Sequence, residues 1–86
     1  MFTIHDTTFD TRLYQATLDF ILVGWEQHVV SVEYVTENGA KDGWVEVYIK
    51  TEDVQLVGRL TDILCLSVDD VTDSNFVPQS HIDKRF

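Results

Sequence analysis

Apolar residues recur at intervals of three and four from residue 14 to residue 29, where Tyr14, Leu18, Ile21, Leu22, Trp25 and Val29 form one stripe. The opposite side of the same helix would carry Arg12, Gln15, Asp19 and Glu26. Two complementary stripes at this period predict an amphipathic helix over 10–27, with Asp10 as its N-cap and Trp25 on the buried face. The apolar run 20–23 and Gly24 are also compatible with a buried strand.

Two segments of alternating apolar and polar residues follow, over 29–36 and 43–50. Asn38-Gly39 lies between them, and these two residues tolerate the positive φ angles of a type I′ turn. The pattern therefore predicts an antiparallel β-hairpin.

A two-residue turn at Asn38-Gly39 would also fix the register of the hairpin. The expected pairs are Val32–Val45 and Val30–Val47 on the core face, and Glu33–Trp44 and Ser31–Glu46 on the other face. A slip that sets Glu33 opposite Glu46 would oppose two like charges, which destabilises a sheet. The turn and the charges predict the same register.

Weaker patterns predict three further elements, namely a strand over 2–5, a helix over 52–62 and a buried strand over 63–68. Asp6-Thr7-Thr8 is typical of a turn between the first strand and the first helix. Thr51 is the expected N-cap of the second helix, with two acids in its first turn. Cys65 would lie in the middle of the last strand, between two leucines.

The predicted order is strand, helix, strand, strand, helix, strand, which resembles the split βαβ, or ferredoxin-like, arrangement. In that α+β arrangement two helices cover one face of a four-stranded antiparallel sheet. The alternative is a β-meander or small barrel with one N-terminal helix, in which 54–60 is a strand. We expect a single globular domain over 1–71 and an extended C-terminal tail over 72–86.

Charge and composition limit the classes of partner. The 86 residues include 15 acidic and 6 basic side chains, for a net charge of −9 spread along the whole chain. Such a surface argues against direct binding to nucleic acid or to anionic membranes. A single cysteine excludes an internal disulfide, and no signal peptide or membrane span is visible, so we expect a soluble, cytoplasmic protein.

No pattern of residues predicts catalysis, a metal site or a cofactor. Cys65 between leucines is typical of a buried thiol rather than a nucleophile. His5, His28 and His81 lie on three different segments without the spacing of metal ligands, and we expect them to be solvated. The chain is therefore predicted not to be an enzyme and to have no cofactor.

The outer face of the hairpin is the candidate binding surface, with Glu33, Val35, Trp44, Glu46 and Tyr48 as the candidate partner-binding residues. Exposed tryptophan and tyrosine, with few lysines, are typical of protein interfaces. The alternative is that the tail, through Phe76 and Val77, covers this face.

Two functions are compatible with these patterns. The first is a non-catalytic acidic interaction protein that binds, and inhibits or neutralises, a basic partner such as a nuclease or a nucleic-acid-binding protein. The second is a regulatory or ligand-binding domain that forms a homodimer through the open face of the sheet.

Overall fold

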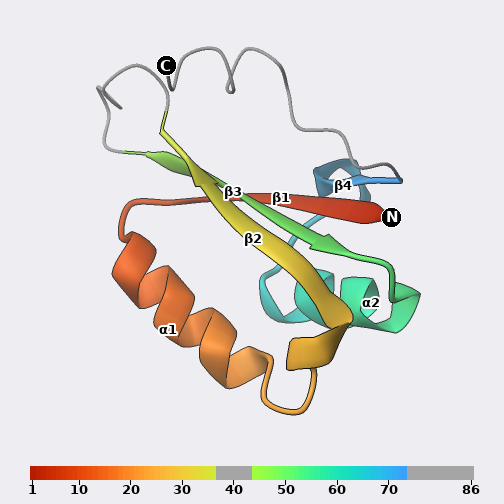
Figure 1. The fold of residues 1–86 in the computed structure, drawn as a ribbon. Helices are drawn as coiled ribbons and strands as arrows, with labels where there is room; N and C mark the ends of the chain where they lie inside the picture. Colours follow the sequence, from red (N-terminus) through yellow and green to blue (C-terminus); the bar gives the residue numbers. More distant parts are fainter. Residues whose placement is uncertain (37–43, 74–86) are drawn as a thin grey trace.

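The computed structural model describes residues 1–36 and 44–73 (Figure 1). Its elements are β1 (Phe2–Thr8), α1 (Thr11–Ile21), β2 (Val29–Val35), β3 (Val45–Thr51), α2 (Val54–Ile63) and β4 (Val71–Thr72). Short 3-10 helices over Glu26–His28 and Val68–Asp70 precede β2 and β4. The four strands form one antiparallel sheet in the order β2-β3-β1-β4. The predicted class, a small α+β domain with two helices and an antiparallel sheet, is confirmed.

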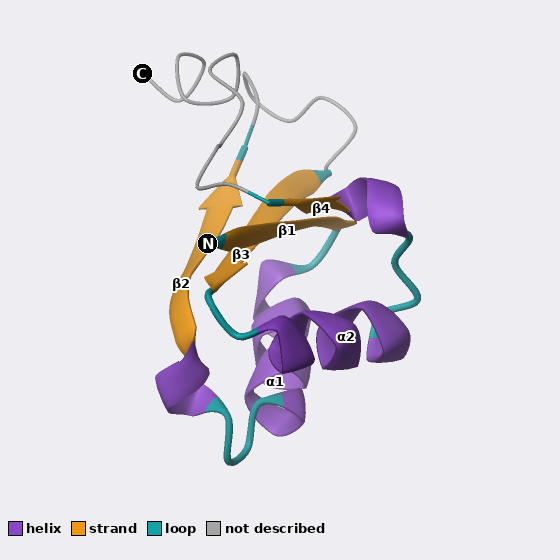
Figure 2. Cartoon of the chain, turned by 90° about the vertical axis from the view of Figure 1, so that its right-hand side faces the viewer, coloured by secondary structure: helices purple, strands orange, loops and turns teal. Residues whose placement is uncertain are grey.

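Both helices pack against the same face of the sheet, as Figure 2 shows. The core between the two layers consists of Ile4, Leu18, Ile21, Leu22, Val47, Ile49, Leu56 and Leu60. Alternate residues of each strand point toward the helices because successive side chains of a strand lie on opposite faces. The described part of the chain contains no helix long and apolar enough to cross a membrane.

Helix α1 begins as predicted and ends earlier than predicted. The Asp10 side chain accepts hydrogen bonds from the backbone N–H groups of Arg12 and Leu13, so Asp10 is the N-cap. The helix ends at Ile21 rather than at residue 27, and Gly24 in the following turn has a φ of 85°. Glycine adopts this conformation without a steric penalty.

Trp25, predicted to be buried on the helix, lies beyond the end of α1 and is only partly buried against the core. Its indole ring is covered by the guanidinium of Arg59, whose Cζ lies 5.9 Å from the ring centre. The Arg59 side chain also donates two hydrogen bonds to the carbonyl oxygen of Ile21. Trp25 therefore connects the end of α1 to α2 at the edge of the core.

The predicted hairpin register is wrong. Val32 lies opposite Ile49 rather than Val45, and Glu33 lies opposite Tyr48 rather than Trp44. The displacement is an even number of residues, so the side chains from Ser31 onward keep their predicted faces of the sheet. An irregularity between Val29 and Ser31 leaves Val30 exposed, against the prediction that it faces the core. Asn38-Gly39 lies outside the described residues.

Strand β1 is longer than predicted, because Asp6-Thr7-Thr8 continues the strand instead of forming a turn. Asp6 lies opposite Val47, on the face that the helices cover. Its carboxylate accepts a 2.8 Å hydrogen bond from the Tyr14 hydroxyl of α1. This bond compensates an acid on the helix-covered face and allows the strand to continue.

The segment after α2 differs most from the prediction. Asp53, not Thr51, is the N-cap of α2, and its side chain accepts from the N–H of Gln55. The helix runs through Ile63, and the predicted buried strand over 63–68 does not form. The last strand is the two-residue β4, in which Thr72, assigned to the tail by the sequence, pairs with Thr3 of β1.

Cys65 ends α2 in a Schellman motif and is exposed, against the prediction of a buried thiol. The N–H of Leu66 donates to the carbonyl oxygen of Thr61, and the N–H of Cys65 donates to that of Asp62. This motif places its central residue in the left-handed region, where Cys65 has a φ of 56°. Glycine is the usual residue at this position.

We expect Cys65→Gly to stabilise the protein by about 1 kcal/mol, because glycine removes the left-handed penalty of a side chain. Cys65→Ala is the matched control, since it retains a Cβ, and it should change stability by less than about 0.5 kcal/mol. Urea unfolding of the three proteins measures both values. A glycine variant no more stable than the alanine variant would contradict this explanation of the helix end.

Candidate partner-binding surface

Four of the predicted contact residues lie together on β2 and β3, on the face of the sheet opposite the helices. Glu33 is opposite Tyr48, and Val35 is opposite Glu46. However, Val35 is only 1% exposed and Tyr48 only 3% exposed. These two side chains are therefore inaccessible to a partner in this conformation, although the face itself was predicted correctly.

The two predicted contact carboxylates are engaged within the chain. The Lys50 Nζ lies 2.9 Å from Glu33 Oε2, and His5 Nε2 lies 2.8 Å from Glu46 Oε1. The His5 ring also stacks on Tyr48, with 5.0 Å between ring centres.

The other described histidine, His28, also pairs with a carboxylate, since its Nδ1 lies 3.0 Å from Asp53 Oδ2. The two described histidines are thus paired with carboxylates rather than merely solvated as predicted.

Among the described residues, an exposed apolar surface lies instead on α1 and in the turn that follows it. We call Leu13, Ala16, Phe20 and Val23 the α1 stripe, because they follow one another at intervals of three and four residues. All four are exposed, and Phe20 is 82% exposed. They lie away from Leu18 and Ile21, which α1 buries in the core. Helix α1 is therefore apolar on two sides.

An aromatic pair lies next to the N-terminal end of α1. Phe9, just before the N-cap, stacks on Trp44, just before β3, with 3.5 Å between ring centres. Phe9 is exposed, and Trp44 is 40% exposed. Of the two aromatic residues predicted to contact a partner, Trp44 is therefore accessible and Tyr48 is not. Trp44 lies at the end of the sheet nearest the start of α1.

The α1 stripe is absent from the sequence-based predictions, which place polar residues on the outer side of this helix. The polar side chains Arg12, Gln15 and Asp19 lie toward one flank, beside β2, rather than opposite the core. Leu13 and Phe20 are separated by seven residues, or two helical turns. That spacing was the available signal for a second apolar stripe.

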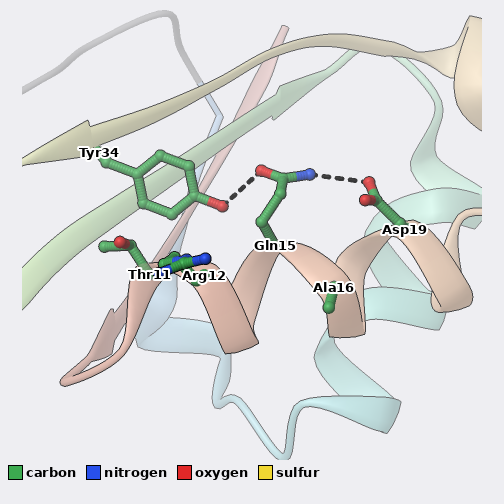
Figure 3. A pocket seen from close by; sticks show the side chains of 6 residues that line it. All are labelled: Thr11, Arg12, Gln15, Ala16, Asp19 and Tyr34. Atoms are coloured by element: carbon green, nitrogen blue, oxygen red, sulfur yellow. Dashed lines mark hydrogen bonds between the residues drawn. The ribbon is translucent and has the colours of Figure 1, made fainter.

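A groove of about 430 Å³ lies between α1 and β2 (Figure 3). It is lined by Thr11, Arg12, Gln15, Ala16, Asp19 and Tyr34. The Tyr34 hydroxyl donates a 2.6 Å hydrogen bond to Gln15 Oε1, and Gln15 Nε2 donates one of 2.8 Å to Asp19 Oδ1. These bonds hold the three polar side chains in a line along the groove.

The tyrosines next to this groove are held in their neutral form. Desolvation raises the pKa of Tyr34, and the nearby Asp19 carboxylate adds to the effect. Burial also raises the pKa of Tyr14 well above its usual range, with a further contribution from its hydrogen bond to Asp6. Both hydroxyls are neutral at neutral pH, and each donates a hydrogen bond, Tyr14 to Asp6 and Tyr34 to Gln15.

Within residues 1–36 and 44–73, no group of three or more His, Cys, Asp or Glu side chains could hold a metal ion. Asp69 and Asp70 lie next to each other in the 3-10 helix after α2, where the Asp70 carboxylate accepts hydrogen bonds from the N–H and Oγ of Ser67 and so caps this helix.

Comparisons with protein-family models, with curated proteins and with solved structures find no significant match to this chain.

Proposed function

We propose that this is a non-catalytic binding protein that inhibits or neutralises a basic protein partner through the α1 stripe. The observation that carries the proposal is the exposed row of Leu13, Ala16, Phe20 and Val23 on a chain of net charge −9. Contiguous exposed apolar side chains on a small domain are typical of interaction sites. Large aromatic side chains at their centre supply most of the binding energy.

Charges next to the stripe favour a basic partner. Asp10 lies at the start of α1, Asp19 on its flank and Glu26 just beyond its end, against one base, Arg12. Elsewhere in the described ranges, Lys50 is paired with Glu33 and Arg59 with the Ile21 carbonyl. An apolar centre within an acidic surface fits a partner with the opposite arrangement.

A nuclease or another nucleic-acid-binding protein is the partner class that this chemistry favours. Such proteins carry basic surfaces that bind phosphates. An acidic protein attracted to that surface would occupy it and exclude the nucleic acid. Inhibition then requires no catalytic group on the inhibitor.

We further propose that the fold belongs to the ferredoxin-like arrangement. Its support is the succession of elements, with β3 between β1 and β2 and both helices on one face. The alternative function, a homodimer through the outer face of the sheet, has less support because Val35 and Tyr48 are buried there.

The proposal predicts a strong salt dependence of association. The immobilised protein would capture its partner from a lysate of the native host, and kinetics with the purified partner would follow at several salt concentrations. The on-rate should fall steeply above about 0.1 M salt, where the Debye length is about 10 Å. Asp19→Asn should slow association more than the control Asp62→Asn on α2.

Addition of one equivalent of the protein should also abolish nucleic-acid binding or cleavage by the captured partner. An on-rate independent of salt would contradict the role of charge. A captured partner that retains its full nucleic-acid activity would contradict inhibition.

A further inference from the structure

Strand β2 forms one edge of the sheet and has seven residues, Val29–Val35. Within the described ranges its only strand partner is β3, which leaves the backbone groups of its other edge directed outward. An edge of this kind is a template for another strand. The opposite edge, β4, has only two residues and offers little to pair with.

Strand β2 has few of the features that usually prevent strand addition, and its one irregularity, between Val29 and Ser31, lies at the start of the strand. Edge strands are commonly protected by lysine, proline or unpaired charges. The sequence of β2, VVSVEYV, contains neither lysine nor proline, and its single charge, Glu33, is paired with Lys50 of the neighbouring strand. Val30 is exposed at the start of the strand. The edge is therefore rich in β-branched residues and open to pairing.

The groove described above lies directly beside this edge, between β2 and α1 (Figure 3). An added strand would lie about 4.8 Å beyond β2, and every second side chain would point toward α1. Those side chains would lie over Gln15, which accepts a hydrogen bond from Tyr34, and over Asp19, which accepts one from Gln15. Edge pairing would supply affinity, and the groove would supply specificity.

We infer that an extended basic segment of the partner adds as a strand to the β2 edge, with its inward side chains in the groove. This inference rests on the proposed function and names the form in which the partner binds. The Asp19 carboxylate would receive a Lys or Arg side chain. Arg12 lies two helical turns from Asp19 on α1, so its positive charge does not neutralise the Asp19 end of the groove. A second copy of this chain fits less well, because two chains of net charge −9 repel each other.

The probe is an acetylated, amidated seven-residue peptide of alternating valine and lysine, followed by amide NMR and hydrogen exchange. It should bind and protect the amides of Val29–Val35. A peptide of alternating valine and glutamate should not bind. An analogue with N-methyl groups on alternate residues, which removes backbone donors, should bind about tenfold more weakly.

Val30→Lys should weaken binding of the lysine peptide by about tenfold, since a lysine on the edge opposes both pairing and a basic strand. Val68→Lys is the control, because Val68 is 83% exposed and lies outside the β2 edge. No binding of the lysine peptide, equal binding of the N-methylated analogue, or protection confined to α2 would overturn the inference. Protection of β2 that rises with protein concentration alone would assign the edge to a second copy instead.

The two proposals fail separately. If Phe20→Ser prevents capture of the partner while Val30→Lys leaves it unchanged and the peptide does not bind, only strand addition is wrong. If the peptide binds β2 while Phe20→Ser has no effect on capture, the α1 stripe is wrong as the contact surface.

Discussion

Ile49→Ala is expected to lower the free energy of unfolding by about 3–4 kcal/mol. Ile49 is fully buried on β3, one of the two central strands of the sheet. Its neighbours on the adjacent strands are Ile4 of β1 and Val32 of β2. Removing its side chain loses the transfer free energy of three carbon atoms and leaves a cavity between the sheet and the helices. A domain of this length has about 4–13 kcal/mol of stability in total, so the loss is a large fraction.

Urea unfolding of Ile49→Ala and of the exposed control Val68→Ala would test this prediction. The control should change stability by less than about 0.5 kcal/mol. A loss below about 1 kcal/mol for Ile49→Ala would mean that the layer between the sheet and the helices is not the principal core.

Phe20→Ser is expected to leave stability almost unchanged and to weaken partner binding by about 2 kcal/mol or more, which is about a 30-fold change in Kd. The Phe20 ring is exposed in the isolated protein, so its removal creates no cavity in the core. In the complex the ring would be desolvated at the centre of the α1 stripe. The loss should appear mainly as a faster off-rate.

Val68→Ser is the matched control for Phe20→Ser, because Val68 is equally exposed but lies in the 3-10 helix after α2. Surface-immobilised kinetics with the captured partner should distinguish the two variants. Equal affinity for Phe20→Ser and Val68→Ser would remove the stripe from the interface. A large effect of Trp44→Ala alone would move the contact to the aromatic pair with Phe9.

The hairpin shows what periodicity can and cannot predict. Alternation assigned Glu33, Val35, Glu46 and Tyr48 to one face, and the structure places them there. The like-charge argument excluded Glu33 opposite Glu46, and it is satisfied equally by the observed pairing of Glu33 with Tyr48. Charge alone could not distinguish the predicted register from the observed one, because both keep Glu33 away from Glu46. Strand β3 also pairs with β1, and this second pairing constrains its position in the sheet.

The helix ends were predictable to different degrees. The N-cap at Asp10 has a recognisable residue type, and α2 ends at Ile63, one residue beyond the predicted end. Helix α1 ends six residues earlier than predicted, because Leu22 and Trp25 continue the apolar spacing beyond the helix. The burial of Val35 and Tyr48 on the outer face agrees with the alternative prediction that this face is covered, but Phe76 and Val77, which were expected to cover it, lie outside the described residues. The α1 stripe was present in the sequence but was obscured by the stronger buried stripe of the same helix.

Methyl cross-saturation NMR of the complex with the captured partner tests the central claim most directly. With the partner saturated, the methyl signals of Leu13 and Val23 should lose intensity, while those of Val35 and Val47, which are buried, should not. That result would place the partner on the α1 stripe. Intensity losses confined to Val54 and Ile63 of α2, with Leu13 and Val23 unaffected, would contradict the account.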